Sequence, residues 1–338
     1  MSTLVPVHAG ADALADFYRG KQVSLVVGYG TGGGYDVYAR LIARYLGKYI
    51  PGNPGIVVQN MPGAASLRAV NYLYNAAPKD GTVIGTFARD MPLLGIMGHP
   101  NARFDPRELI WLGSSSSYRN DAYLMFARSD APVKSIEDAR RPDGPPLVLG
   151  GTGEGASGND VSTVLRDALG LNLKIVVGYP DSNAIFLAVD RKEVDGRCVG
   201  LSSVHSSHAE WLQPGSGMRA LVQFARTSRH PAFPNTPTAR ELAMSESARA
   251  LIEFAEIPYA LSRPFAAPPG VPKDRASALQ AAFLLAHRDL QFLDEADRLK
   301  IEVSPIGGAE VLSAVMKIAT APNELIDYMK KLFAQKKS

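Results

Sequence analysis

Five glycines lie within seven residues of the segment VVGYGTGGGYD, at Gly28, Gly30, Gly32, Gly33 and Gly34. Glycine lets successive backbone N–H groups point toward one place, and the helix expected after this loop adds the positive end of its dipole. A loop of this composition is suited to hold an anion. Asp36 is placed to cap the start of that helix with a side-chain oxygen.

The same loop matches the dinucleotide-binding pattern G-x-G-x-x-G at Gly28, Gly30 and Gly33. A dinucleotide site also uses an acidic residue at the end of the second strand, and the expected strand ends in Gln59-Asn60 instead. No Lys-Ser/Thr pair follows the glycines, which excludes a P-loop. An NAD(P)-dependent oxidoreductase stays open as an alternative function.

A second glycine-rich loop, GGTGEGASGND, follows a strand-like segment about 120 residues later. Thr152 and Ser157 add hydroxyl donors to its backbone amides. Ligands of open α/β sheets bind at the carboxyl ends of the strands, where both loops would lie. Two such loops predict a cleft in which charge-assisted hydrogen bonds from both halves hold one carboxylate.

The elements around these loops alternate between strands and helices, which predicts an α/β fold with largely parallel sheets. Strands are expected at residues 23–27, 56–59, 80–87, 109–115 and 122–129, with a helix over 36–49 and a turn followed by a helix within 60–76. A second unit repeats the plan, with strands at 146–151, 173–177, 194–203 and 218–225 and helices over 161–169 and 184–191. A strand within 257–272 returns to the first unit, and helices follow over 273–299 and 309–333.

The composition of the chain limits its number of domains and the partners that it can be expected to bind. A chain of 338 residues with 46% hydrophobic and 20% charged residues is globular and long enough for two domains. The net charge of +3 is spread over mixed signs, so nucleic acid is not an expected partner. The lone Cys198 excludes an intramolecular disulfide and is expected to be a small buried residue. The N-terminus is set aside as a signal remnant or a tail.

Several segments, in a fixed order, resemble the tripartite tricarboxylate transporter receptors, also called Bug-type solute-binding proteins. VVGYGTGGGYDVYARLIARYL is similar to the family's V-P-x-x-x-G-G-x-x-D-x-x-A-R opening, and IVVQNMPGAAS to VVENRPGAGG. MRALVQFARTSRHPAFPNTPTARELA is similar to LRALAVTSxxRxPxxPDVPTxxEL. The resemblance extends over residues 20–335.

The resemblance implies a two-lobed, periplasmic-binding-protein-like fold (type II-like), in which each lobe is a mostly parallel sheet flanked by helices. The expected division is an N-terminal extension over 1–19, lobe 1 over 20–121 plus 256–338, and lobe 2 over 122–255. The implied protein is a monomeric periplasmic receptor without catalytic activity, cofactor or metal. It captures a small organic acid between the lobes and delivers it to a membrane permease. A ligand sensor for a two-component system is a further alternative.

The resemblance also assigns ligand-binding positions to three loops. They are Gly32, Gly33, Gly34, Tyr35 and Asp36 in the first loop, Thr152, Gly153, Ala156 and Ser157 in the second, and Tyr179, Ser182 and Asn183 in the third. Two departures from the family concern these loops. Tyr35 stands where Thr or Ser is common, and the third loop, GYPDSN, lacks the family's lysine.

Other side chains are candidates on chemical grounds. Tyr29 and Tyr118 would line the cleft together with Tyr35 and Tyr179, which suits an aromatic or extended acid. Arg89 could take a second carboxylate in a bidentate pair, or pair with Asp90 at the surface. Arg119 is a weaker candidate of the same kind. His205 and His208 could share a helix face as metal ligands, but a solvated or capping role is favoured.

Overall fold

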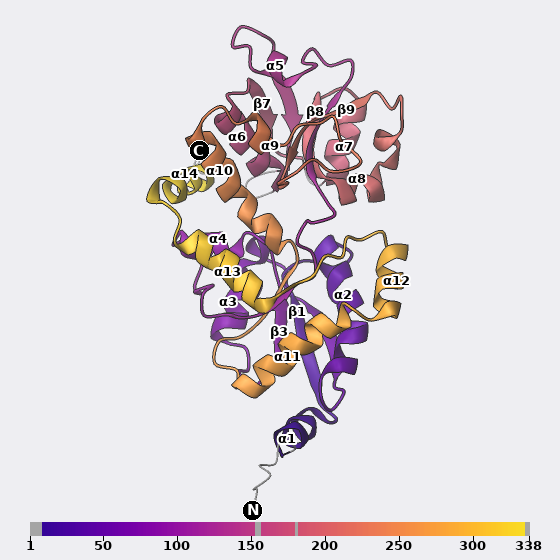
Figure 1. Ribbon diagram of the computed structural model, residues 1–338, viewed down its shortest axis with the longest axis vertical. Coiled ribbons are helices and arrows are strands. Elements are labelled where there is room, and N and C mark those ends of the chain that lie inside the picture. The colour runs from indigo at the N-terminus through magenta and orange to yellow at the C-terminus, as the bar shows by residue number, and fades with distance from the viewer. Residues whose placement is uncertain (1–8, 153–156, 180–181, 335–338) are drawn as a thin grey trace, which may run out of the picture. The chain divides into compact units, whose positions relative to one another are not determined.

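The computed structural model describes residues 9–152, 157–179 and 182–334. Contacts divide the chain into two compact units. The first is formed by Met1–Ser117 and Pro258–Thr320, and the second by Tyr118–Ile257 and Ala321–Ser338. Each unit contains one mixed β-sheet flanked by helices (Figure 1).

The sheet of the first unit has the order β11-β4-β10-β3-β1-β2. Strand β1 runs parallel to β2 and β3, whereas β10 is antiparallel to both β3 and β4. The amino end of β10 therefore lies at the same edge as the carboxyl ends of β1, β2 and β3. The strands are β1 (Gln22–Val27), β2 (Gly55–Asn60), β3 (Val83–Thr86), β4 (Ile110–Ser114), β10 (Pro264–Ala267) and β11 (Ile306–Gly307).

Helices cover both faces of this sheet, and a hydrophobic core lies under each face (Figure 1). One core joins α2, α11 and α12 to β1, and the other joins α3, α4 and α13 to β3 and β4. The helices are α1 (Ala9–Tyr18), α2 (Gly34–Leu46), α3 (Leu67–Asn75), α4 (Met91–Ile96), α11 (Lys273–Ala286), α12 (Leu290–Arg298) and α13 (Gly308–Ala319), with single turns η1 (Gly47–Tyr49) and η2 (Ala64–Ser66).

Helix α2 shows why this sequence forms a fixed element behind the first glycine loop. Its apolar residues recur every three to four positions, so that Leu41, Ile42 and Leu46 are fully buried on one face. The opposite face carries Arg40 and Arg44 toward solvent. Burial of that apolar face fixes the helix, and with it the position of the loop that precedes it.

The second unit has a five-stranded sheet of order β7-β6-β8-β5-β9, in which β6 is parallel to β7 and β8 and β5 is antiparallel to β8 and β9. Its strands are β5 (Tyr123–Arg128), β6 (Leu147–Gly150), β7 (Leu173–Val176), β8 (Gly196–Gly200) and β9 (Met218–Phe224). Its helices are α5 (Ile136–Ala139), α6 (Ser157–Leu169), α7 (Ser182–Asp190), α8 (Leu201–Ser207), α9 (Ala239–Leu242), α10 (Glu246–Glu256) and α14 (Asn323–Ala334), with the turn η3 (Ala209–Leu212); the turn η4 (Ile257–Leu261) follows α10.

The expected α/β order is confirmed, and three details differ from expectation. Both sheets are mixed, because β10 and β11 run against the other strands of the first sheet and β5 runs against the other strands of the second. Helix α6 begins at Ser157, four residues before the expected start. The N-terminal region set aside on sequence grounds contains α1, whose Tyr18 is fully buried and donates a hydrogen bond to Gly81 O over 3.1 Å.

The last helix, α14, belongs to the second unit. Tyr328 of α14 donates a hydrogen bond to Asp167 of α6 over 2.7 Å, whereas the sequence-based division places residues 256–338 together in lobe 1. None of the helices that the structure describes between residues 9 and 334 combines the length and the apolar character that a membrane crossing requires.

Candidate functional site

The carboxyl edge of the first sheet brings together segments that are distant in the sequence. The glycine loop follows β1, Asn60 ends β2, and Arg89 follows β3. Arg263 precedes the antiparallel β10 and therefore lies at the same edge. This edge is the place where open α/β sheets bind ligands.

A buried polar network holds the glycine loop in shape. Asp36, whose side chain is 2% exposed, accepts hydrogen bonds from Gly32 N–H, Arg40 Nε and Asn60 Nδ2, each over 2.8 Å. Asn60 Nδ2 also donates to the backbone oxygen of Tyr29 over 2.9 Å. Burial acts to raise the pKa of Asp36, but the hydrogen bonds from Arg40, Gly32 and Asn60 outweigh it and lower that pKa.

This network corrects the capping role expected for Asp36. Helix α2 has Gly33 at its N-cap, with no side-chain hydrogen bond there. The carboxylate of Asp36 instead bonds to Gly32, one residue before the cap. Asp36 thus fixes the path of the loop and leaves the first amides of the helix available to a ligand.

Those amides form a row at the start of α2. Gly32, Gly33 and Gly34 are all exposed. Within the described part of the chain, no acceptor contacts the N–H groups of Gly33, Gly34 and Tyr35. Uncapped amides at the positive end of a helix dipole are favourable partners for a carboxylate or another anion.

Two tyrosines of the loop pack on each other. The rings of Tyr29 and Tyr35 stack with centroids 4.7 Å apart and an interplanar angle of 16°. Burial raises the pKa of Tyr29 above its ordinary range. A hydrogen bond with Ser66 acts to lower that pKa but does not outweigh the effect of burial. The hydroxyl of Tyr35 accepts a hydrogen bond from Arg89 N–H over 3.0 Å. The hydroxyl at position 35 is therefore directed at the segment after β3.

Arg89 is buried, with 9% exposure, and does not lie at the surface. Its guanidinium lies 4.5 Å from the ring centre of Tyr259 and donates to Ser262 Oγ over 3.3 Å. A second arginine that sequence reasoning missed, Arg263, lies 4.6 Å from the ring centre of Tyr35. Two positive side chains therefore border the loop.

The remaining predicted site residues belong to the second unit, and two of them, Gly153 and Ala156, lie outside the described residues. Thr152 follows β6 and Ser157 begins α6, at the carboxyl edge of the sheet. Tyr179 follows β7, and burial raises the pKa of its hydroxyl. Ser182 and Asn183 are exposed and begin α7. Tyr118 is buried, with a positive φ of 59°.

Arg197 of β8 is a further residue that the sequence reasoning did not single out. It is 5% exposed and donates from Nη1 to Ser182 O over 2.6 Å and from Nη2 to Ser182 Oγ over 3.0 Å. Its guanidinium also lies 4.3 Å from the ring centre of Phe186. Burial lowers its pKa to about 10. Arg197 thus fixes the start of α7, where two predicted ligand-binding residues lie.

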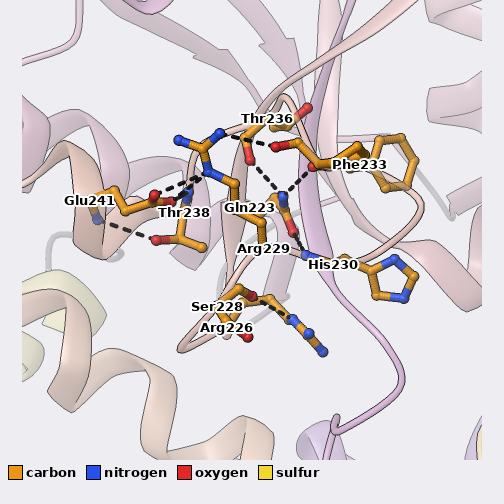
Figure 2. Close-up of polar contacts among 10 residues, drawn as sticks. Gln223, Arg226, Ser228, Arg229, His230, Phe233, Thr236, Thr238 and Glu241 are labelled. Carbon is orange, nitrogen blue, oxygen red and sulfur yellow. Dashed lines mark hydrogen bonds and ion pairs between the residues drawn. The ribbon is translucent and has the colours of Figure 1, made fainter.

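The segment after β9, which carries one of the family-like motifs, forms a polar cluster of its own (Figure 2). The fully buried Gln223 donates from Nε2 to Phe233 O and Thr236 O and accepts from His230 N–H. Glu241 closes a capping box with Thr238 at the start of α9. These bonds join backbone to side chain within one loop, so we assign the motif a structural role.

Three other sequence-based candidates have local structural partners. His208 stacks on Phe186 with ring centroids 4.0 Å apart and lies 3.4 Å from Asp190, and His205 is exposed. Among the residues that the structure describes, no three His, Cys, Asp or Glu side chains form a group able to hold a metal ion. Cys198 is buried, and burial raises the pKa of its thiol to about 12. Arg119 is exposed, and its backbone oxygen accepts from Arg226 over 2.6 Å.

Comparison with known proteins supports the family resemblance. No family model matches the chain. A UPF0065 protein of Bordetella pertussis is 24% identical over 285 residues, which cover 83% of this chain and 81% of that protein.

Solved structures match over nearly the whole chain. A TctC solute-binding protein from Polaromonas has 19% identity and a TM-score of 0.70, covering 93% of this chain and 99% of that one. The periplasmic binding protein BugD has 20% identity and a TM-score of 0.65, with 93% and 98% covered. MatC from Rhodopseudomonas palustris, with bound malate, has 19% identity and a TM-score of 0.63, with 91% and 99% covered. The chain therefore has the fold of TctC- and Bug-type periplasmic solute-binding proteins, which confirms the resemblance read from its motifs.

Proposed function

We propose, from the fold that this chain shares with TctC- and Bug-type solute-binding proteins, that it is a periplasmic receptor for a small organic acid. In this role it captures the acid and delivers it to the membrane permease of a tripartite tricarboxylate-type transporter. The protein performs no catalysis on its ligand. The malate bound in MatC supports a carboxylate as the class of ligand.

The observation that carries this proposal is the row of amides without an intramolecular acceptor at Gly33, Gly34 and Tyr35. The row begins a helix whose dipole favours an anion, and a buried carboxylate holds the loop open without occupying those amides. A ligand carboxylate would accept hydrogen bonds from Gly33, Gly34 and Tyr35 N–H. Thr152, Ser157, Tyr179, Ser182 and Asn183 stay predicted contributors from the second unit.

The same geometry disfavours a nicotinamide cofactor. The position at the end of β2 that holds the ribose in dinucleotide-binding proteins is Asn60. The amide of Asn60 is engaged with Asp36 and with the backbone of Tyr29. The polar group at this position supports the loop rather than a ribose.

A thermal-shift screen tests the proposal, because a ligand that binds only the folded protein raises its melting temperature. We expect mono- and dicarboxylates to raise the melting temperature and NAD(P) to leave it unchanged. The hits are then measured by titration calorimetry. Stabilisation by NAD(P) with no response to any carboxylate would contradict the proposal.

Gly33→Val tests the amide row directly. Gly33 has φ −77° and ψ 165°, and a Cβ there would meet only Gly30 O at 3.8 Å, so the fold tolerates the change. The branched side chain would cover the neighbouring amides and abolish carboxylate binding. Gly55→Val, at the opposite end of the sheet with similar space around it, is the matched control and should bind normally.

A further inference from the structure

A buried arginine of the second unit lies behind the exposed start of α7. Arg197 of β8 is 5% exposed, whereas Ser182, the first residue of α7, is exposed. Arg197 Nη1 donates to Ser182 O over 2.6 Å, and Nη2 donates to Ser182 Oγ over 3.0 Å. A ligand that reaches this surface would therefore meet the serine, and the guanidinium would act on the ligand only through it.

Aromatic packing holds this guanidinium in place. Arg197 lies 4.3 Å from the ring centre of Phe186, and His208 stacks on the same ring with centroids 4.0 Å apart and an interplanar angle of 11°. Two groups at these distances cannot share one face, so the ring of Phe186 lies between them. Trp211 packs edge-on against that ring with centroids 4.8 Å apart. This packing fixes the direction in which Arg197 presents its two donors to Ser182.

The chemistry of this bond decides where the Ser182 hydroxyl proton points. A guanidinium carries only donors, and a pKa lowered by burial to about 10 still leaves Arg197 protonated at neutral pH. Ser182 Oγ must therefore accept from Arg197, and its own proton is left to be donated elsewhere. Within the described part of the chain, that hydroxyl donates to no acceptor. A hydroxyl that accepts from a charged donor is also a stronger donor itself.

We propose that Arg197 is a positioning residue for ligand binding, which directs the Ser182 hydroxyl to donate a hydrogen bond to an oxygen of the bound acid. The inference rests on the proposed function, in which Ser182 is a predicted contributor. A serine hydroxyl alone can either donate or accept. With Arg197 behind it, this hydroxyl favours ligand groups that accept, such as carboxylate or hydroxyl oxygens, and the positive charge disfavours an ammonium group.

The test is a double-mutant cycle on ligand affinity. Succinate, malate and adipate are the probes, measured by titration calorimetry, and the cycle uses the one that wild-type protein binds most tightly. Ser182→Ala should weaken its binding about tenfold, because a hydrogen bond to a charged acceptor is lost. Arg197→Met should weaken it about fivefold, because the hydroxyl is no longer held as a donor. The double variant should lose about tenfold rather than about fiftyfold, since both changes remove the same bond.

Conservative variants separate positioning from a general structural role. Arg197→Lys keeps a cation that only donates, and Ser182→Thr keeps the hydroxyl, so each should bind within about threefold of wild type. The matched control is Arg140→Met, since Arg140 of the same unit also donates to two oxygens, Leu169 O over 3.2 Å and Leu242 O over 2.7 Å. The control should bind as wild type does. Melting without ligand verifies folding, and Arg197→Lys with Ser182→Ala completes the cycle if Arg197→Met does not fold.

The outcomes separate this inference from the proposed function. Unchanged affinity in Ser182→Ala, or losses that multiply in the double variant, would overturn the positioning role of Arg197 and leave the receptor function in place. A loss in Arg140→Met as large as that in Arg197→Met would overturn it as well, because the effect would then not depend on Ser182. Failure of wild-type protein to bind any of the three acids would contradict the proposed function, and the inference would fall with it.

Discussion

The two glycine-rich loops have similar sequences, but different contacts hold them. In the first unit, side chains bond to the loop backbone: Asp36 to Gly32 N–H, Asn60 to Tyr29 O and Ser66 to Gly28 O. In the second unit, the described part of the loop is held by backbone bonds. Gly151 N–H donates to Val176 O over 2.8 Å, and Gly151 O accepts from Tyr179 N–H.

Two loops with similar glycine patterns can therefore lose their shape through different kinds of substitution. Loss of a polar side chain should damage the first loop, whose shape depends on a buried carboxylate. The second loop should respond mainly to steric changes, because Asn159 packs directly against Gly151. The variants below are ordered by expected effect.

Asp36→Ala should have the largest effect. It removes three hydrogen bonds and leaves the donors of Asn60 and Gly32 without their acceptor, at a cost of about 3 kcal/mol in the free energy of unfolding. Urea unfolding measures this cost. Hydrogen exchange should rise over residues 28–36 and stay unchanged in the loop after β6.

An exposed ion pair supplies the control. Asp16 and Arg19 lie 2.6 Å apart with both side chains largely exposed, so Asp16→Ala should cost less than about 1 kcal/mol. If Asp36→Ala were as mild as Asp16→Ala, the buried network would not determine the shape of the first loop.

The sequence predicts the loop better than the residues that support it. Glycine spacing and the flanking periodicity identify β1, α2 and the row between them, because these signals are local. Asn60, Ser66 and Arg263 reach the loop only through sheet order, which local patterns do not contain. The position of Arg263 could have been predicted, because a strand that returns antiparallel beside β3 begins at the edge where the parallel strands end. The sequence analysis assigned no antiparallel neighbour to β3, so it did not place Arg263 at that edge.

Acid should destabilise the first unit through His287, at the carboxyl end of α11. Burial lowers the pKa of His287 to about 4, while Nδ1 donates to Phe283 O and Nε2 accepts from Ser115 Oγ. The unfolded chain binds a proton near pH 6.5 and the folded one does not, so stability falls as the pH drops from 6.5 toward 4. The loss should be about 2 kcal/mol between pH 7.5 and 5.

Urea unfolding at a series of pH values measures this loss. His287→Gln removes the titrating group and should flatten the profile over that range. Hydrogen exchange assigns the effect: protection should fall at pH 5 in α11 and β4 before it falls in the second sheet. A wild-type profile that is flat from pH 7.5 to 5 would contradict the prediction.

Replacing single glycines by alanine tests how much space surrounds the backbone of each loop. A Cβ on Gly28 would lie 2.5 Å from Ser66 Oγ and 2.7 Å from Ser66 Cβ, and the Cβ cannot rotate away. Gly28→Ala should therefore cost about 2 kcal/mol. Gly30→Ala, in the same loop with nothing within 4 Å, should change stability by less than about 0.5 kcal/mol. Similar costs for both variants would show that the crowding at Ser66 is relieved by movement of the backbone.

Gly151→Ala should have a smaller effect than Gly28→Ala, although its close contact is the shorter of the two. A Cβ there would lie 1.7 Å from Asn159 Oδ1, but this atom ends a side chain that can rotate, and within the described residues it has no hydrogen-bond partner to lose. We expect a cost of about 1 kcal/mol. Adding Asn159→Ala should recover most of it, so that the double-mutant cycle gives a favourable coupling of nearly the same size. Additive losses would mean that Asn159 supports the second loop through its amide, and the contrast with Asp36 would then disappear.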